Sequence, residues 1–277
     1  MEHQRSFSAG RLPRHINPRL HAESTTASGH YFLQEVTPEV RAALLNNPRI
    51  QSSFLATDAE DTTAFDQVPF ATMSLLSRSR FAASEQREKG EGEAEKLAIR
   101  RVSRISLPSM YKRDALCLEV VPPDGSAGKV VSLVNVHLDS LWPAFAYRAQ
   151  QIQILADMLR EPGCKGGIIA GDFNAISPKD HELVSENRLV DAWEALRGTD
   201  ATGGDGATWG TGLQQASRRS PGRLDKIVMT GLTPEEIAIL QLSGIEVPRP
   251  GKDSISIPWS DHAGLLCTLG SNSYYND

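Results

Sequence analysis

The sequence predicts an α/β fold in which two packed β-sheets are covered by helices. Apolar runs of strand type recur along the 277 residues, on both sides of the helical segments, with few regular strand–helix alternations. A doubly wound parallel sheet would show such alternations throughout, so two packed sheets are favoured. Hydrophobic residues make up 40% and charged residues 23% of the chain, which is ordinary usage for a globular protein with its own core.

Short patterns predict the elements of the N-terminal part. The apolar-rich run YFLQEV at 31–36 predicts a strand. Pro38 suits the first position of a helix over 38–47, in which apolar residues recur on one side. The run FATMSLLS at 70–77 predicts the next strand.

The rest of the chain predicts a series of strands around two helices. A helix at 144–161 places Ile152 and Leu155 on one face, and a second helical segment covers 181–198, at least in its second half. Residues 122–129 contain Pro, Asp and Gly and predict a hairpin connection. The strand-like runs lie at 101–108, 115–123, 129–138, 166–174, 223–231 and 262–270.

The ends of the chain and one internal stretch differ from the predicted domain at 30–270. Residues 1–29 are polar and irregular, so we expect them to be disordered. Residues 84–97 are rich in charge and contain two glycines, which is typical of a solvated loop insert; a partner-binding insert is the alternative. Residues 271–277 are expected to form a C-terminal tail.

Whole-chain properties exclude several classes of protein. No apolar run approaches the roughly 20 residues of a membrane helix, and the N-terminus lacks the apolar segment of a secretory signal. Three cysteines without metal-type spacing indicate reduced thiols, so we expect an intracellular protein of the nucleus or cytoplasm. We also expect a monomer. Because the net charge is −5, any surface that binds phosphates must be local.

Polar side chains stand at the ends of several apolar strands, where α/β proteins place functional sites. Each has a structural alternative: Glu35 could cap a helix, Asp172 and Asn174 could form an Asx turn, and His137 could be a core histidine. Together they supply oxygen and imidazole ligands without a cysteine cluster, which suits Mg²⁺ and suits zinc poorly. The positions are Glu35, Asn135, His137, Asp139, Asp172, Asn174, Asp261 and His262.

Five motifs in order carry a resemblance to a known family. LQEV, HLDS, GDFN, RLDKI and SDH resemble the signature of the endonuclease/exonuclease/phosphatase (DNase-I-like) superfamily, over about 30–270. Within it, the fragments LQEVTPEV, ATWGTG and SDHAGLLCTL most resemble the tyrosyl-DNA phosphodiesterase 2 group. The resemblance implies a four-layer α/β sandwich that uses Mg²⁺, with Mn²⁺ as a substitute, to hydrolyse phosphodiesters.

The resemblance also implies roles for the metal and the attacking water. Glu35 matches the family's metal-binding glutamate, and Asp261 matches an acid near the metal. Asp172 matches the aspartate that positions or deprotonates the water. Asn174 matches the asparagine that holds phosphate and water. Phosphodiester hydrolysis needs these parts, because an anionic substrate repels a nucleophile unless a cation and hydrogen-bond donors offset the charge.

Further roles concern the phosphate and the nucleic acid. His262 matches the histidine that hydrogen-bonds the scissile phosphate, Asp225 matches the aspartate that orients it, and His137 matches a histidine near the phosphate. Trp209 could stack on a base or tyrosine, or be an ordinary packed tryptophan. Asn135 is expected to contact substrate. Basic pairs such as 112–113 could track a DNA backbone or lie in solvent.

We therefore predict a Mg²⁺-dependent phosphodiester hydrolase acting on DNA ends, with 5′-tyrosyl adducts as the expected substrate. One alternative is another phosphoesterase of the superfamily, acting on RNA, inositol phosphates or lipid phosphates. The second alternative is a truncated member with weak or no activity. The family's first core strand carries a catalytic asparagine, and residues 1–29 offer no such strand, so we expect the chain to lack it.

Overall fold

The structure is a computed structural model that describes residues 29–83, 96–122, 129–198, 206–211, 220–241, 243–258 and 260–269. The predictions for 1–28, for 84–95 of the charged insert and for 270–277 lie outside the described residues. Described helices are too short or too polar to cross a membrane.

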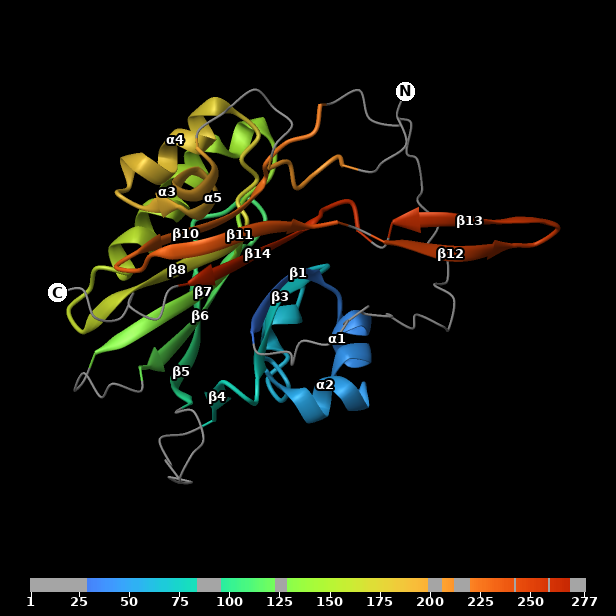
Figure 1. The fold of residues 1–277 in the computed structure, drawn as a ribbon, viewed down its shortest axis with the longest axis horizontal. Coiled ribbons are helices and arrows are strands. Elements are labelled where there is room, and N and C mark those ends of the chain that lie inside the picture. Colours follow the sequence, from blue (N-terminus) through green and yellow to red (C-terminus); the bar gives the residue numbers. More distant parts are fainter. Residues whose placement is uncertain are drawn as a thin grey trace.

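A seven-stranded mixed sheet forms the centre of the molecule, in the order β4-β5-β6-β7-β8-β10-β9 (Figure 1). Strands β7 and β8 are parallel, whereas β10 runs antiparallel to β8. The C-terminal ends of β7 and β8 therefore meet the start of β10 at one edge of the sheet. The strands are β4 (Phe81–Ala82), β5 (Leu97–Ser106), β6 (Asp114–Val121), β7 (Val130–His137), β8 (Cys164–Asp172), β9 (Val190–Asp191) and β10 (Asp225–Thr230).

Helices α3 (Phe145–Met158) and α4 (Pro178–Glu186) cover one face of this sheet. Val134 and Val136 of β7 pack against these helices, while Val131 and Leu133 belong to the core on the opposite face. The alternation follows from the two-residue period of a strand. The large sheet thus has an apolar core on both sides. Helix α5 (Ala192–Arg197) contacts β10 and the strand β11 described next.

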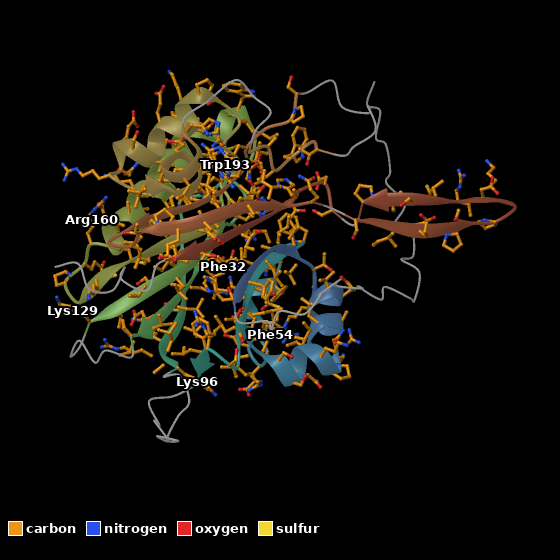
Figure 2. All side chains as sticks on the ribbon, in the orientation of Figure 1. Phe32, Phe54, Lys96, Lys129, Arg160 and Trp193 are labelled. Atoms are coloured by element: carbon orange, nitrogen blue, oxygen red, sulfur yellow. The ribbon has the colours of Figure 1, made fainter. Side chains whose placement is uncertain are left out.

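Two smaller sheets lie on the opposite face, β1-β3-β2 and β11-β14 (Figure 1). Phe32 of β1 packs against the core between these sheets and the large sheet (Figure 2). Helices α1 (Pro38–Leu45) and α2 (Pro48–Ser53) lie outside the β1–β3 sheet and complete a four-layer α/β sandwich, as predicted. The strands are β1 (His30–Val36), β2 (Phe54–Ala56), β3 (Ala71–Ser77), β11 (Pro234–Leu240) and β14 (Gly264–Leu269).

Asn135 joins the two β-layers, which corrects the expectation that it contacts substrate. Its side chain is fully buried in β7. Its amide nitrogen donates to the carbonyl oxygens of Met73 (2.9 Å) and Leu33 (3.2 Å), and its amide oxygen accepts from Gln34 (2.7 Å). A buried amide that satisfies backbone carbonyls of the facing sheet stabilises the sandwich and has no surface for a ligand.

Two parts of the structure differ from what the sequence predicted. The segment 181–198, predicted to be helical at least in its second half, holds most of α4 and all of α5, with β9 between them; Arg188, just after α4, has a positive φ of 56° that does not continue a helix. Strands β12 (Gly244–Arg249) and β13 (Lys252–Pro258) form a hairpin that projects from the body (Figure 1). Most of its residues are exposed, so no buried face marks it in the sequence.

Strand β1 is the first strand of the described part of the chain. Within that part, β1 is hydrogen-bonded to β3 and β14 is hydrogen-bonded to β11, each along one of its two edges. The two small sheets are therefore separate. The expected lack of the family's first strand concerns residues before Gly29 and stays a prediction.

Candidate active site

Three titratable side chains form a row across three strands of the large sheet. His137 ends β7, Asp172 ends β8 and Asp225 begins β10, and the strand register pairs Asp172 with both of the others. The Nε2 atom of His137 lies 3.4 Å from Oδ2 of Asp172. Gly171 makes the close approach of β7 and β8 possible, because a Cβ at this position would overlap the carbonyl oxygen of Val136.

His262 completes the row from a different part of the chain. It lies just before β14, and its Nδ1 is 2.8 Å from Oδ2 of Asp225. The ligand atoms of Asp172, Asp225 and His262 all lie within 4.8 Å of one another. The fold therefore brings together three residues that the sequence singled out, from β8, from β10 and from the segment before β14.

Thr208 connects the two members of the Asp225–His262 pair. It is fully buried, and its hydroxyl accepts a hydrogen bond from the backbone N–H of Asp225 (3.0 Å). Its carbonyl oxygen accepts from the backbone N–H of Ala263 (2.6 Å), the residue after His262. Thr208 is thus a positioning residue that fixes the start of β10 relative to His262.

Thr208→Val should lower kcat by up to about tenfold and lower the pKa of His262, because the Asp225 N–H loses its acceptor. Thr208→Ser keeps the hydroxyl and should restore both values. An NMR titration of the His262 imidazole, together with steady-state rates, measures the two effects. If the valine variant only melts earlier, with its rate and the pKa of His262 unchanged, Thr208 has no positioning role.

Asp172 has the electrostatics of a base. Its carboxylate is buried, and burial together with the nearby charges of Asp225 and Glu35 raises its pKa to about 7, although His262 and the backbone N–H of Asn174 partly oppose the shift. That N–H donates to Oδ1 of Asp172 at 2.8 Å. A group with a pKa near neutrality serves well as a general base.

His262 has the electrostatics of a hydrogen-bond donor. Burial lowers its pKa, but the hydrogen bond to Asp225 and the charges of Asp225, Asp172 and Asp261 outweigh burial and raise the pKa to about 9. The imidazole is therefore protonated at neutral pH. Because Nδ1 is held by Asp225, the Nε2–H group is left to serve a substrate.

The carboxylates around this row fit a divalent cation. Burial is the main reason that the pKa of Asp172 is raised, and the negative charges of Asp225 and Glu35 raise it further, so several carboxylates lie near one another here. Glu35 itself is exposed at a bulge in β1, with a positive φ of 54°. Oxygen ligands and local negative charge are what Mg²⁺ and Mn²⁺ require. Asp172 and Asp225 place two carboxylates within 4.8 Å of each other, and this pair could take part in holding such an ion.

Asn174 and the Trp209–Asp261 pair border the row. The amide of Asn174 donates to the carbonyl oxygen of Leu138 (2.9 Å), which orients the amide toward the end of β7. The indole N–H of Trp209 donates to Oδ2 of the exposed Asp261 (3.1 Å). Trp209 is therefore a link between the segment of Thr208 and the segment of His262. Stacking of Trp209 on substrate stays a prediction.

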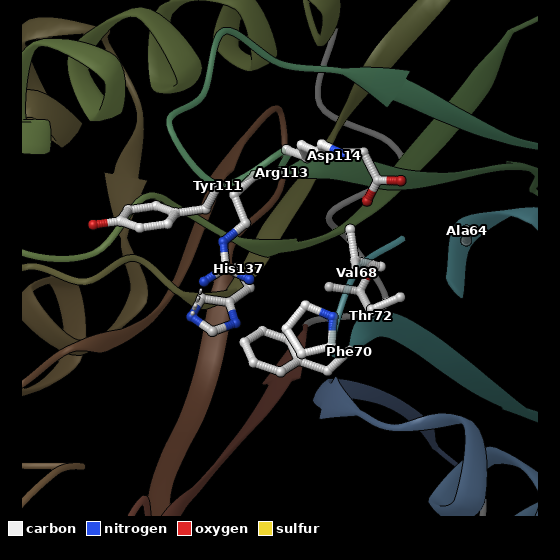
Figure 3. Close-up of a pocket in the computed structure, with 11 residues that line it drawn as sticks. Ala64, Val68, Phe70, Thr72, Tyr111, Arg113, Asp114 and His137 are labelled. Carbon is white, nitrogen blue, oxygen red and sulfur yellow. Dashed lines mark hydrogen bonds between the residues drawn. The ribbon is translucent and has the colours of Figure 1, made fainter. Parts of the chain in front are cut away.

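A pocket of about 160 Å³ opens beside His137 (Figure 3). Arg113 lies over the ring of Phe70, 5.0 Å from its centroid, and Phe70 stacks on His137 with centroids 5.6 Å apart. The Nη2 atom of Arg113 is 3.3 Å from Nε2 of His137. Burial, together with the charges of Arg113 and His262, lowers the pKa of His137 to about 3, so this imidazole is neutral. Tyr111 also lines the pocket.

The sequence did not identify Arg113, Phe70 and Thr208 as parts of the site. Arg113 stood out only as half of a basic pair, and Phe70 as the start of a strand. They reach His137 from distant segments of the chain, so no local spacing could reveal them. Thr208 precedes Trp209 in the ATWG fragment, which is the only signal that could have pointed to it.

Comparison with known proteins places this geometry in context. Humanized D. rerio TDP2 carrying 14 mutations matches with a TM-score of 0.60 and 23% identity over 87% of this chain and 85% of that chain. D. rerio TDP2 complexed with a single-stranded DNA product matches with 0.60 and 22% over 87% and 86%. A mannosyl-6-phosphatase from Bacteroides thetaiotaomicron matches with 0.56 and 12% over 87% and 85%.

These likenesses show a shared fold. No curated protein matches the chain significantly. The profile of the Endonuclease/Exonuclease/phosphatase family matches residues 31–262, which include every member of the row and both Glu35 and Asp261. Members of this family are hydrolytic phosphoesterases, which agrees with a base, a protonated histidine and carboxylates gathered at one sheet edge. The chain belongs to the endonuclease/exonuclease/phosphatase family.

Proposed function

We propose that this protein is a divalent-metal-dependent phosphodiesterase that acts on the ends of DNA, with 5′-tyrosyl adducts as substrate. The observation that carries the proposal is the part of the row formed by Asp172, Asp225 and His262, in which a buried base lies beside a protonated histidine. Such a pair suits the attack of water on a phosphodiester. Glu35 and Asp261 are the remaining acids at the site.

Asp172 activates the water. With a pKa of about 7 it is largely ionised at slightly alkaline pH and can accept the proton as the water attacks phosphorus. Asn174 is held beside it by the 2.8 Å bond from its backbone N–H to Asp172 and by the bond from its side chain to Leu138. An amide nitrogen carries two N–H groups, so one remains for a phosphoryl oxygen.

His262 stabilises the charge that develops on the phosphoryl group. Its Nε2–H donates to a phosphoryl oxygen while Nδ1–H is held by Asp225. Glu35 and Asp261 would supply oxygen ligands for a divalent cation. When bound, the divalent cation adds positive charge that offsets the anionic substrate.

The pocket beside His137 supports a bulky leaving group. Phe70 and Tyr111 provide aromatic surface, and the guanidinium of Arg113 provides positive charge between them. This lining suits an aromatic ring attached to a phosphate. The similarity in fold to TDP2, including a structure with a single-stranded DNA product, supports the same substrate class.

The rate should depend on pH in a bell shape. Asp172 acts as a base and loses this form as the pH falls through its pKa of about 7. His262 acts as a donor and loses its proton as the pH rises through about 9. We expect kcat/KM to be highest between these values. Asp225→Asn should move the alkaline limb to lower pH; a profile that stays flat from pH 6 to pH 10 contradicts both assignments.

A substrate panel tests the proposal. The purified chain is incubated with a 5′-phosphotyrosyl oligonucleotide, an RNA oligonucleotide, an inositol phosphate and a sugar phosphate, each with Mg²⁺, Mn²⁺ or EDTA. We expect release of tyrosine from the oligonucleotide with either metal and none in EDTA. Full activity in EDTA refutes the metal requirement. Selective hydrolysis of RNA, the inositol phosphate or the sugar phosphate refutes the DNA-end assignment.

A further inference from the structure

Four large apolar side chains are exposed on two loops beside the catalytic row. We call them the platform: Met110, Tyr111, Leu141 and Trp142, with exposed fractions of 52%, 39%, 53% and 67%. Single exposed apolar residues are ordinary, but a group of them on adjacent loops indicates a contact surface.

Asp139 holds the two loops side by side. It is fully buried, and its carboxylate accepts hydrogen bonds from the Ser109 hydroxyl (2.5 Å) and from the backbone N–H of Met110 (2.7 Å). Gln151 of α3 strengthens the junction by donating to Asp139 (3.0 Å) and to the carbonyl oxygen of Pro108 (2.8 Å). These bonds hold the loop of Met110 against the segment that leads from Asp139 to Trp142.

The backbone of Leu141 is strained, and a buried ion pair maintains the strain. Leu141 has φ 71° and ψ 162°, a region that is almost restricted to glycine. Arg148 donates to the carbonyl oxygens of Leu141 (2.8 Å) and Asp139 (2.9 Å). Arg148 is buried and bonds Asp180 at 2.7 Å. The strained backbone of Leu141 lowers the stability of the fold, yet it leaves the side chains of Leu141 and Trp142 exposed to water. Packing of the core does not explain this arrangement.

The platform lies within reach of a substrate in the catalytic row. The carbonyl oxygen of Leu138 accepts a bond from Asn174, and Trp142 follows Leu138 by four residues. Four residues span at most about 14 Å. Stacked nucleotides along one strand are about 3.4 Å apart. A strand whose end lies in the catalytic row would therefore reach Trp142 within its first few nucleotides. Lys112 is exposed and follows Tyr111 directly, so it provides positive charge beside the platform.

We propose that the platform binds unpaired bases of the nucleic-acid strand whose end occupies the catalytic row, with Trp142 as the main stacking surface. Aromatic side chains stack on bases of any sequence, and cations beside them track the backbone. This inference rests on the proposed function and adds to it a preference for single-stranded ends.

Binding measured without turnover tests the platform. The affinity of a 5′-phosphorylated single-stranded oligonucleotide is measured by fluorescence anisotropy in EDTA, for the full chain and for Trp142→Ala. The alanine variant should bind about 5- to 100-fold more weakly. Trp142→Phe keeps an aromatic ring and should stay within a few-fold. Ile154→Ala, a change at an exposed apolar residue of α3, is the matched control and should bind normally.

An oligonucleotide with abasic residues near its 5′ end completes a double-mutant cycle. Removing the bases should weaken binding to the wild type as much as Trp142→Ala does. Combining the abasic strand with Trp142→Ala should weaken binding little further. If the wild type binds normal and abasic strands equally, the platform does not stack on bases, whatever the chain hydrolyses. If the wild type binds neither strand, the proposal of a nucleic-acid substrate is refuted as well. If Trp142→Ala leaves strand affinity unchanged but dissociates a dimer in sedimentation velocity, the surface serves a second copy and the proposal is overturned.

Discussion

Asp172→Asn should lower kcat by about 10²–10⁴-fold with little change in fold. The asparagine retains the shape of the side chain and its bond from the backbone of Asn174, but it cannot accept a proton from water. The variant should not be less stable through lost charge, because burial already disfavours the ionised carboxylate. Steady-state kinetics and circular dichroism measure the two properties.

Asp157→Asn provides the matched control for this substitution. Asp157 is an exposed acid of α3 whose side chain is 69% accessible, so its removal should leave the rate unchanged. A near-native rate for Asp172→Asn would mean that another group, or the metal-bound form of the site alone, activates the water. The role given to Asp172 would then be wrong.

His262→Ala should lower kcat by about 10²–10³-fold, because the developing charge loses a positioned donor. Asp225→Ala should have the same effect in weaker form, since Asp225 acts by holding Nδ1 of His262 and by raising its pKa. The double variant should be scarcely slower than His262→Ala alone. This cycle is measured as kcat at saturating substrate and metal.

Additive losses in the cycle would show that Asp225 contributes independently of His262. Asp225 also lies close to the carboxylate of Asp172, so additive losses would favour a direct contact of Asp225 with the metal over a role through His262. Melting temperatures of the single variants complete the test, because a general loss of structure would lower all rates together. The expected pattern is a preserved melting temperature with non-additive rates.

Much of the fold could be predicted because the strands of the large sheet are buried on both faces. The runs that became β6, β7 and β8 are nearly continuous apolar segments, and such segments identify core strands. Helix α3 could be predicted from its buried stripe of Ile152 and Leu155. The β12–β13 hairpin has no such signal, since it packs against no core along most of its length.

The candidate site was predictable as a set of residues but not as an arrangement. Polar residues at strand ends identified His137, Asp172 and His262, and the family resemblance added Asp225. Asn135 has the same local pattern yet is fully buried, because only the register of the facing sheet decides which polar residue of β7 becomes a structural link. Arg113 and Phe70 meet through tertiary packing, which no sequence spacing encodes.

Hydrolysis of a 5′-phosphotyrosyl oligonucleotide in ¹⁸O-labelled water, with Mg²⁺ present, tests the central claim most directly. If Asp172 directs water at phosphorus while His262 stabilises the phosphoryl oxygens, mass spectrometry will find one ¹⁸O atom in the 5′-phosphate of the product DNA and none in the released tyrosine. Label in the tyrosine hydroxyl, or no release of tyrosine by the wild type under conditions where another phosphoester is hydrolysed, would contradict the account.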